Sequence, residues 1–496
     1  MEKIIIFPPI PVVHVPITLF NSNKQAIDSK YILECNWFID DEIVQSFNDN
    51  VDHHIGTQLK RTSSTSLLSL VTSIDQPKTL TYIPTLKDAN KTLKVTCKFK
   101  SKILNLIPDT SIFQYEHKVL SSKSNSQREI YYLDNSLNHP NNNTINNNNF
   151  SSSKSNLGAS LQNYRVIQYN ILADGYVSKF IFPYCEPYAL FYQYYRKYLI
   201  GKQILQYNPD IIGLQEVEDS YVDLFKEMEE CGYVRSPPFS NCTGLPITPG
   251  AAQEGCVIFY RSSRFQVISH LLIRYQTINA QTCSVPNSIL TLEQYQLLLQ
   301  EPIFKPILEK VMPFTDHHTK HVLLLLQDKQ TQRIFVAASI HNYWGSISKM
   351  EFNYQFQCLQ IVILSMILEN FLRSNQLPLD TGVVLCGDFN AGPESESYKF
   401  LSKGFFSDTA KITIPFQSPF IFKSIYSQLP YGEPRFTTYT KSFQGNIDQI
   451  FINNSFQTHS ILDISDRSLY NEFGYLPSIV LGSDHILLLS DIELKK

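Results

Sequence analysis

The sequence predicts an α/β protein, a four-layer α/β/β/α sandwich preceded by a small β-rich domain at the amino-terminal end. Three observations give this prediction. An Asn- and Ser-rich tract at residues 135–157 separates two segments with different hydrophobic patterns. The second segment contains many short apolar strands and few crossover helices, which favours two packed sheets over one doubly wound sheet. Polar signatures accompany five of those strands, which indicates one hydrophilic pocket where the strands converge.

The composition restricts the class of protein. The formal net charge is −3 and the pI is about 6.5, so any nucleic-acid contact must be a local patch. The nine cysteines form no CxxC pair, which predicts neither a zinc site nor a disulfide framework. Reduced thiols favour a cytoplasmic or mitochondrial protein over a secreted one. The apolar run at residues 361–368 is too short to span a bilayer, so no membrane partner is expected.

The first segment, residues 1–134, is expected to be the small β-rich domain. Residues 91–100 alternate between apolar and polar side chains, which is the pattern of a half-buried strand. Shorter apolar runs at 31–33 and 80–83 predict further strands of an antiparallel sandwich.

His53 and His54 could be a metal-binding pair, but adjacent side chains on a strand point to opposite faces. A surface loop is therefore the better interpretation of this pair. The tract at residues 135–157 cannot bury apolar surface and is interpreted as a disordered linker to the catalytic segment, residues 158–496.

The second segment shows an alternation of short strands and longer helices. Its apolar runs predict strands at residues 166–169, 211–214, 256–260, 334–340, 383–386, 450–452 and 486–489. Apolar residues at helical spacing predict helices at residues 187–207, 220–231 and 349–372. The last of these helices is apolar on all sides in its second half, so it is expected to be buried on more than one face.

The five signatures each lie at the end of one of these apolar runs. They are Tyr169–Leu172, Leu214–Glu216, Gly387–Asn390, Ile447–Phe451 and Ser483–His485. Glu216 and Asp388 supply hard anionic oxygens, and Asn170 and Asn390 supply neutral ones. This donor set suits Mg²⁺, with Mn²⁺ as an alternative, better than zinc. Such a cation can polarise a phosphoryl oxygen.

The histidines suggest a second function within the same pocket. A carboxylate such as Asp448 beside His485 would hold the imidazole in one tautomer and stabilise its cation. The imidazolium could then donate hydrogen bonds to a phosphate, while Asp388 or a metal-bound water could supply the base that activates the attacking water. His341 ends another strand and is a third candidate for phosphate contact. Together these residues indicate phosphodiester or phosphomonoester hydrolysis.

Each signature also has a structural interpretation when it is taken alone. Residues 388–393 contain Asp, Asn, Gly and Pro and could form only a turn. Glu216 could be a helix N-terminal charge, and His485 could be a core residue with its hydrogen bonds satisfied. The ordered set favours a functional site, because five independent coincidences are less probable than one.

The ordered motifs resemble the endonuclease/exonuclease/phosphatase superfamily, the fold of deoxyribonuclease I and the apurinic endonucleases, over roughly residues 163–496. Within it, the sequences YNILAD at 169–174, FTTYT at 436–440 and FQGNID at 443–448 look most like the deadenylase and 2′-phosphodiesterase branch. Enzymes of that branch remove adenylates from RNA 3′ ends or cut 2′,5′-oligoadenylates. A β-rich domain before the catalytic domain, with no visible Leu-rich repeat, is similar to the 2′-phosphodiesterases.

The resemblance implies a role for each site residue. The implied catalytic residues are Asp388, His485, Asp448, His341 and Asn170. The implied metal ligands are Glu216, Asp388, Asn390 and Asp484. The implied substrate contacts are Asn390, Phe443 and Asn170, with Phe443 stacking on a base.

The chain departs from the family pattern at three places. Ser339-Ile340-His341 stands where the family usually has Asn-Thr-His, so any hydrogen bond of that Asn is in question. Gln449 replaces a frequent Tyr, and Asn446 replaces a small or apolar residue. None of these changes removes a catalytic group, so an active enzyme is expected.

The expected function is a Mg²⁺-dependent phosphodiesterase that hydrolyses oligoadenylate or single-stranded RNA and releases AMP. One alternative is a phosphatase of a small molecule, such as a dinucleotide 2′-phosphate or an inositol phosphate. Clusters of Lys and Arg near the pocket would favour this alternative. The sequence shows only scattered basic residues, such as Arg261 and Arg264. Another alternative is a catalytically inactive RNA-binding module. The intact Glu216, Asp388 and His485 argue against that alternative.

Overall fold

A computed structural model describes residues 163–495, apart from 192, 219–220, 238–253, 287, 315–319, 346–349 and 465–473, together with eight strands that precede residue 163. The chain divides into two compact units, Met1–Asn125 and Ser126–Lys496. The tract at 135–157 and the His53–His54 pair lie outside the described residues.

The first unit contains two antiparallel sheets, and strands occur at all three places where the sequence predicted them. One sheet has the order β1-β2-β5, and the other has the order β4-β3-β6-β7. The strands are β1 (Ile5–Phe7), β2 (Ile17–Phe20), β3 (Ile32–Ile39), β4 (Glu42–Asn48), β5 (Thr81–Tyr82), β6 (Leu93–Phe99) and β7 (Thr110–Gln114).

The second unit contains two large mixed sheets. The seven-stranded sheet has the order β11 (Tyr233–Arg235), β12 (Glu254–Arg261), β10 (Ile211–Glu218), β9 (Asn163–Asn170), β22 (Leu488–Leu494), β21 (Phe456–Leu462) and β8 (Ile130–Tyr132). The six-stranded sheet has the order β13 (Phe265–Arg274), β14 (Lys320–Asp328), β15 (Ile334–His341), β16 (Gly382–Asp388), β20 (Asp448–Asn453) and β17 (Phe422–Ser424). A separate hairpin joins β18 (Thr438–Tyr439) and β19 (Gln444–Gly445).

Two details differ from the expected elements. β8 precedes the Asn-rich tract, yet it pairs with β21 at the edge of the seven-stranded sheet. The last strand begins at Leu488 and not at residue 486, because the chain around His485 bridges to Thr438 instead.

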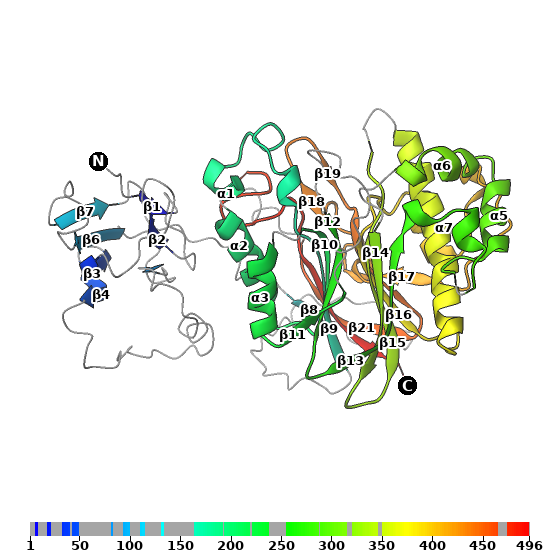
Figure 1. The fold of residues 1–496 in the computed structure, drawn as a ribbon, viewed down its shortest axis with the longest axis horizontal. Coiled ribbons are helices and arrows are strands. Elements are labelled where there is room, and N and C mark those ends of the chain that lie inside the picture. Colours follow the sequence, from blue (N-terminus) through cyan, green and yellow to red (C-terminus); the bar gives the residue numbers. More distant parts are fainter. Residues whose placement is uncertain are drawn as a thin grey trace, which may run out of the picture. The chain divides into compact units, whose positions relative to one another are not determined.

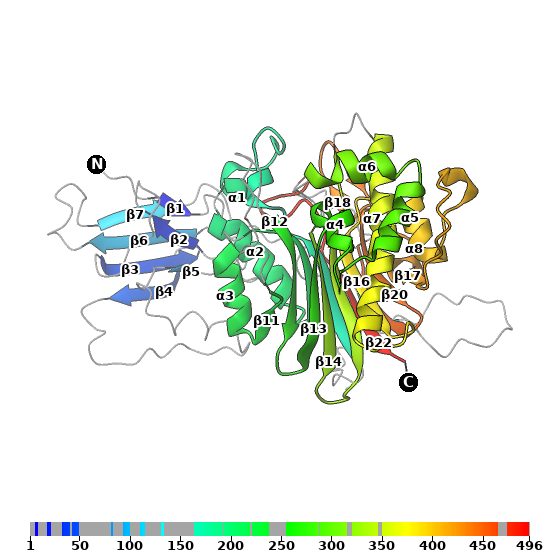
Figure 2. The same cartoon turned by 45° about the vertical axis from the view of Figure 1, so that its right-hand side comes forward.

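Helices cover the outer faces of the two sheets, which gives the predicted four layers (Figures 1 and 2). On the seven-stranded side they are α1 (Pro187–Phe191), α2 (Gln193–Leu205) and α3 (Val222–Glu230). On the six-stranded side they are α4 (Ala280–Cys283), α5 (Leu292–Gln300), α6 (Lys305–Lys310), α7 (Met350–Ser374) and α8 (Glu396–Lys403). Each layer of helices shares one apolar core with the sheet beneath it.

Helix α7 is the longest helix among the described residues, and its burial was predicted. By length and composition it could cross a membrane, but 83% of its most apolar window is buried inside the protein. The apolar residues on all its faces therefore pack against the six-stranded sheet and the helices α5, α6 and α8, as expected for a central helix.

The two sheets approach each other closely beneath the site. A Cβ atom at Gly213, on β10, would lie 2.6 Å from the Cβ of Cys386, on β16. Since real Cβ atoms essentially never come so close, a larger residue would force the strands apart. Glycine at this position therefore lets the ends of β10 and β16, which carry Glu216 and Asp388, lie next to each other.

Candidate active site

The topology brings the polar signatures to one edge of the sheet pair. β9 and β10 are parallel, and so are β15 and β16, so Asn170, Glu216 and Asp388 lie at corresponding ends of their strands. Asp448 is the first residue of β20 and His485 lies three residues before β22, so neither follows its strand as predicted. Both strands run antiparallel to their neighbours, so their beginnings lie at the same edge as the ends of the others.

Asn170 connects the two acidic residues from the two sheets. A bulge in β10 after Leu214 places Glu216 at φ +58°, which turns its carboxylate into the site. The Asn170 Nδ2 donates to Glu216 Oε1 at 2.9 Å and to Asp388 Oδ2 at 3.0 Å, while Ala173 N donates to Glu216 Oε2 at 2.9 Å. Burial raises the pKa of Glu216.

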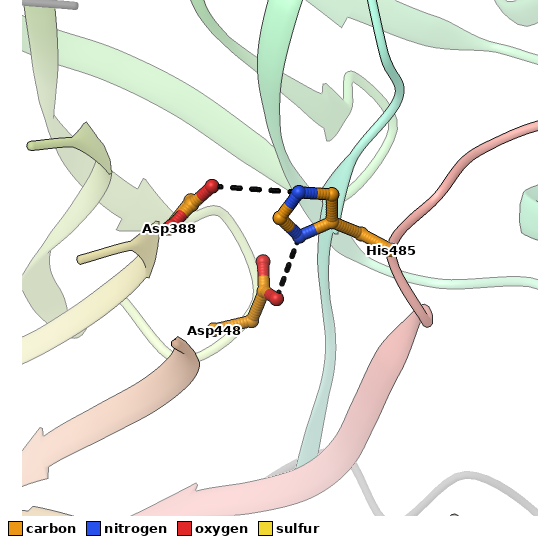
Figure 3. A group of neighbouring side chains, drawn as sticks. All are labelled: Asp388, Asp448 and His485. Atoms are coloured by element: carbon orange, nitrogen blue, oxygen red, sulfur yellow. Dashed lines mark hydrogen bonds and ion pairs between the residues drawn. The ribbon is translucent and has the colours of Figure 1, made fainter. Parts of the chain in front are cut away.

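His485 and Asp448 form a hydrogen-bonded pair (Figure 3). His485 Nδ1 lies 2.8 Å from Asp448 Oδ2, and its Nε2 lies 3.7 Å from Asp388 Oδ2, so each carboxylate faces one ring nitrogen. Asp448 also accepts hydrogen bonds from Gln168 and from Thr437. Burial alone would lower the pKa of His485, but the surrounding carboxylates, Asp448 first, raise it well above its usual value. These carboxylates therefore orient the imidazole ring and favour its protonated form.

Asp388 is the titratable group between the two histidines. Its Oδ1 accepts from the backbone N of Asn390 at 2.9 Å, which fixes the carboxylate plane. Burial, and then the charge of Asp448, raises the pKa of Asp388 to about 6. A carboxyl group with this pKa can both accept and return a proton near neutral pH.

His341 approaches the same oxygen of Asp388 as His485 does, and it has a second acidic neighbour that the sequence did not single out. Its Nε2 is 3.7 Å from Asp388 Oδ2, and its Nδ1 is 3.8 Å from Glu254 Oε2. Burial opposes the charge on His341, but Glu254 and then Asp388 raise its pKa to about 9. Glu254 stands two residues before the predicted strand at 256–260, and that was its only signal in the sequence.

Asp484 and Asn390 border this cluster. The Asp484 Oδ1 is buried without a hydrogen-bond partner among the described residues, 4.0 Å from His485 Nε2. Asn390 has φ +51° and its Nδ2 donates to the carbonyl of Asn342 at 2.9 Å, so it anchors the loop after His341.

Phe443 lies apart from these buried groups. It is 36% exposed at the turn of the β18–β19 hairpin, and its ring centroid is 5.7 Å from that of Trp344. The structure thus brings together the predicted carboxylates and histidines and leaves Phe443 on the surface of the hairpin.

A chain of buried hydrogen bonds supports the site from between the sheets, and it involves one of the departures from the family pattern. Gln168 donates to Gln215 as well as to Asp448, and Gln215 donates to Ser339 Oγ at 3.0 Å. Ser339 Oγ in turn donates to the carbonyl of Leu214 at 2.8 Å. Ser339 therefore provides a polar contact between the sheets where the missing Asn was expected to matter.

The charges of the cluster fit a divalent cation. Five buried or largely buried carboxyl groups lie close to two imidazoles, so acidic groups outnumber basic ones in the cluster. The carboxylates are Glu216, Glu254, Asp388, Asp448 and Asp484. The unpartnered Oδ1 of Asp484 is one oxygen such an ion could take. Asp388, Asp448 and His485 also offer ligand atoms within 4.8 Å of one another.

Comparisons with known proteins agree with the motifs. The sequence model of the Endonuclease/Exonuclease/phosphatase family matches residues 356–485. The chain is 25% identical over 378 residues to the CCR4-Not complex 3′-5′-exoribonuclease subunit Ccr4 of Mycosarcoma maydis, covering 68% of this chain and 51% of that protein. It is 26% identical over 362 residues to human 2′,5′-phosphodiesterase 12, covering 67% and 52%. The chain thus spans about half the length of these curated relatives.

Two solved structures are also similar. The catalytic domain of human Nocturnin is 22% identical, with a TM-score of 0.44, and the match covers 67% of this chain and 95% of that one. ANGEL2, described as a 2′,3′-cyclic phosphatase, is 19% identical, with a TM-score of 0.49 and coverage of 68% and 96%.

Proposed function

We propose that this chain, whose motifs and four-layer fold are those of the endonuclease/exonuclease/phosphatase superfamily, is a Mg²⁺-dependent phosphodiesterase that hydrolyses oligoadenylate and releases AMP. The substrate would be the 3′ end of single-stranded RNA, a 2′,5′-oligoadenylate, or both. The observation that carries the proposal is the oriented His485–Asp448 pair opposite Asp388, inside a cluster where carboxyl groups outnumber imidazoles. Relatives named as a 3′-5′-exoribonuclease and a 2′,5′-phosphodiesterase support the substrate class.

The cation would be held by Glu216, Asp388 and Asp484, whose oxygens are the hard ligands that Mg²⁺ prefers. When bound, it would polarise a phosphoryl oxygen and offset the charge that develops there. Asn170 would keep Glu216 and Asp388 at a fixed separation, because its amide donates to both carboxylates.

His485 would stabilise the reacting phosphate electrostatically. Its Nδ1–H is held by Asp448, so its Nε2–H points towards the region in front of Asp388, where a phosphate oxygen could accept it. His341, also protonated near neutral pH, would provide a second donor next to Asp388.

Asp388 would transfer the proton of the reaction. A water oxygen attacks phosphorus while the Asp388 carboxylate accepts one of its protons. The bond from phosphorus to the leaving ribose oxygen breaks, and the proton held by Asp388 passes to that oxygen. Charge and atoms balance, since one water is consumed and a ribose hydroxyl end and a nucleoside monophosphate are produced. Phe443, beside Trp344, would stack on the departing adenine.

The decisive experiment is hydrolysis of 5′-labelled oligo(A) in the 3′,5′ and in the 2′,5′ linkage, with Mg²⁺ or Mn²⁺, followed by chromatographic detection of AMP. We expect AMP from at least one linkage, and we expect Glu216→Gln to abolish turnover while oligo(A) binding persists. AMP from neither linkage, together with turnover of a phosphomonoester, would replace the proposal with the small-molecule phosphatase. Binding without turnover under every condition would indicate an inactive RNA-binding module.

A further inference from the structure

A second group of aromatic side chains lies beside the site, on the other face of the hairpin that carries Phe443. We call it the tyrosine row: Tyr184, Tyr439 and Tyr475. The ring centroids of Tyr439 and Tyr475 are 5.5 Å apart with planes inclined by 34°, and those of Tyr475 and Tyr184 are 5.4 Å apart. All three residues are partly exposed. Phe436, which is buried, supports the row from below at 4.7 Å from Tyr439.

The backbone fixes the tyrosine row next to the catalytic residues. Tyr439 N donates to the carbonyl of Asp484 at 3.1 Å, and Leu476 N donates to the carbonyl of Tyr439 at 2.8 Å. Thr438 forms an antiparallel bridge with His485. The Tyr184 hydroxyl donates to the carbonyl of Leu476, which connects the loop after β9 to the same segment.

The pleat of the hairpin separates the tyrosine row from Phe443. Tyr439 pairs with Gln444 across the hairpin, so these two side chains share one face. Phe443, one residue before Gln444, belongs to the opposite face. Its ring lies over Gly445, where an added Cβ would be 2.8 Å from Phe443 Cζ. Exposed Lys441 lies at the tip between the two faces, where its ammonium group could offset a phosphate charge.

We propose that the tyrosine row is a second base-stacking subsite, which takes a base on the opposite side of the hairpin from Phe443. This inference rests on the proposed function and narrows its substrate to single-stranded oligonucleotides with a base on each side of the hairpin. A duplex cannot use the subsite, because its bases are stacked on one another. A small phosphomonoester has no second base to place there.

The test compares Tyr475→Leu with Tyr475→Phe, because only the second keeps the ring. Binding of 5′-fluorescein-labelled oligo(A) six nucleotides long is measured by fluorescence anisotropy in EDTA, where no turnover occurs. We expect Tyr475→Leu to raise Kd about tenfold and Tyr475→Phe to change it less than about twofold. Phe405→Ala, which removes an exposed aromatic after α8, serves as the matched control.

Equal Kd values for the two Tyr475 variants would overturn the subsite, even if wild-type protein hydrolyses oligo(A). A lower Tm of Tyr475→Leu without a change in Kd would overturn it as well, since the row would then only support its own loop. If the wild type releases no AMP but binding still depends on the ring, the subsite stands and the proposed hydrolysis fails. Failure of the wild type to bind oligo(A) would contradict both.

Discussion

At the residue scale, His485 depends on Asp448 for its tautomer and for its charge. Asp448 is fully buried and accepts three hydrogen bonds, from Gln168, Thr437 and His485, so it cannot turn away from the ring. The same carboxylate raises the pKa of both His485 and Asp388. One buried carboxylate therefore raises the pKa of two groups at the candidate site.

Asp448→Asn should separate these roles from substrate binding. We expect kcat to fall by about 100- to 10,000-fold, because the amide cannot stabilise the imidazolium, while Kd for oligo(A) changes less than about threefold. Steady-state kinetics and anisotropy binding measure the two quantities. Parallel losses in kcat and in binding would mean that His485 contributes mainly to ground-state affinity and that the pair is misassigned.

The site residues differ in how well the sequence revealed them. Asn170, Asp388 and His485 stand in short polar motifs beside apolar runs, and the structure brings all three together. Glu254 was missed, because its approach to His341 depends on how β12 packs across β15 in the other sheet. Neither the residues next to Glu254 in the sequence nor its distance along the chain from His341 predicts this contact between the two sheets.

At the element scale, Arg196 on α2 connects two loops of the site. Its guanidinium is fully buried and donates to the carbonyl of Ile171 at 2.9 Å and to that of Gly482 at 3.0 Å. It also donates to Asp174 and to the hydroxyl of Tyr221. The loop after Asn170 and the loop before Asp484 therefore share one rigid support.

Arg196→Met should destabilise the second unit and Arg196→Lys should impair catalysis. Removing one partner of a buried ion pair costs about 3–5 kcal/mol of unfolding free energy, which urea denaturation measures. Lysine keeps the charge but cannot reach both carbonyls, so we expect kcat to fall up to about 100-fold through misplacement of Asn170 and Asp484. Arg373→Met, at an exposed pair with Glu369, is the control. Wild-type activity of Arg196→Lys would show that the loops hold their position without the guanidinium.

His321 on β14 supports the end of β15 and gives the fold a sensitivity to acid. Its Nε2 lies 3.0 Å from the carbonyl of His341, and its Nδ1 lies 3.2 Å from the Tyr275 hydroxyl. Burial lowers the pKa of His321 from its ordinary 6.5 to about 3. As the pH falls below 6.5, the unfolded chain takes up a proton that the folded chain refuses, so stability is lost from there down to about pH 3.

His321→Gln removes this titration. We expect the free energy of unfolding of the variant to fall less steeply between pH 6.5 and pH 4 than that of the wild type, measured by urea denaturation at each pH. His270→Gln, at an exposed position on β13, should follow the wild-type curve. Identical slopes for His321→Gln and the wild type would assign the acid sensitivity to other groups.

At the scale of the whole molecule, the sequence predicted the layers of the fold better than the edge strand and the short helices. Apolar runs such as 334–340 and 383–386 identified the central strands, because strands buried on both faces are continuously apolar. The edge strand β8 could not be predicted, because pairing of residues 130–132 with β21 depends on contacts more than 300 residues apart. The sequence did not predict helices α4 to α6, which lie within residues 280–310. Each of them is short, and short helices depend on tertiary packing, here in the apolar core that they share with α7.

We expect a divalent cation to stabilise the folded second unit, because the proposed site gathers more carboxyl groups than imidazoles. Like charges at close range destabilise the fold unless they are neutralised, and an ion that binds only the folded state stabilises it by mass action. A Mg²⁺ concentration of about 100 times Kd should contribute about 2.7 kcal/mol, which corresponds to a rise in Tm of roughly 2–4 °C for a unit of this size. Glu216→Gln should lose most of this Mg²⁺-dependent increase in Tm, because it removes one anionic ligand. Asp380→Asn, exposed before β16, should respond to Mg²⁺ as the wild type does. An equal rise in Tm for Glu216→Gln and the wild type would show that the ion binds elsewhere.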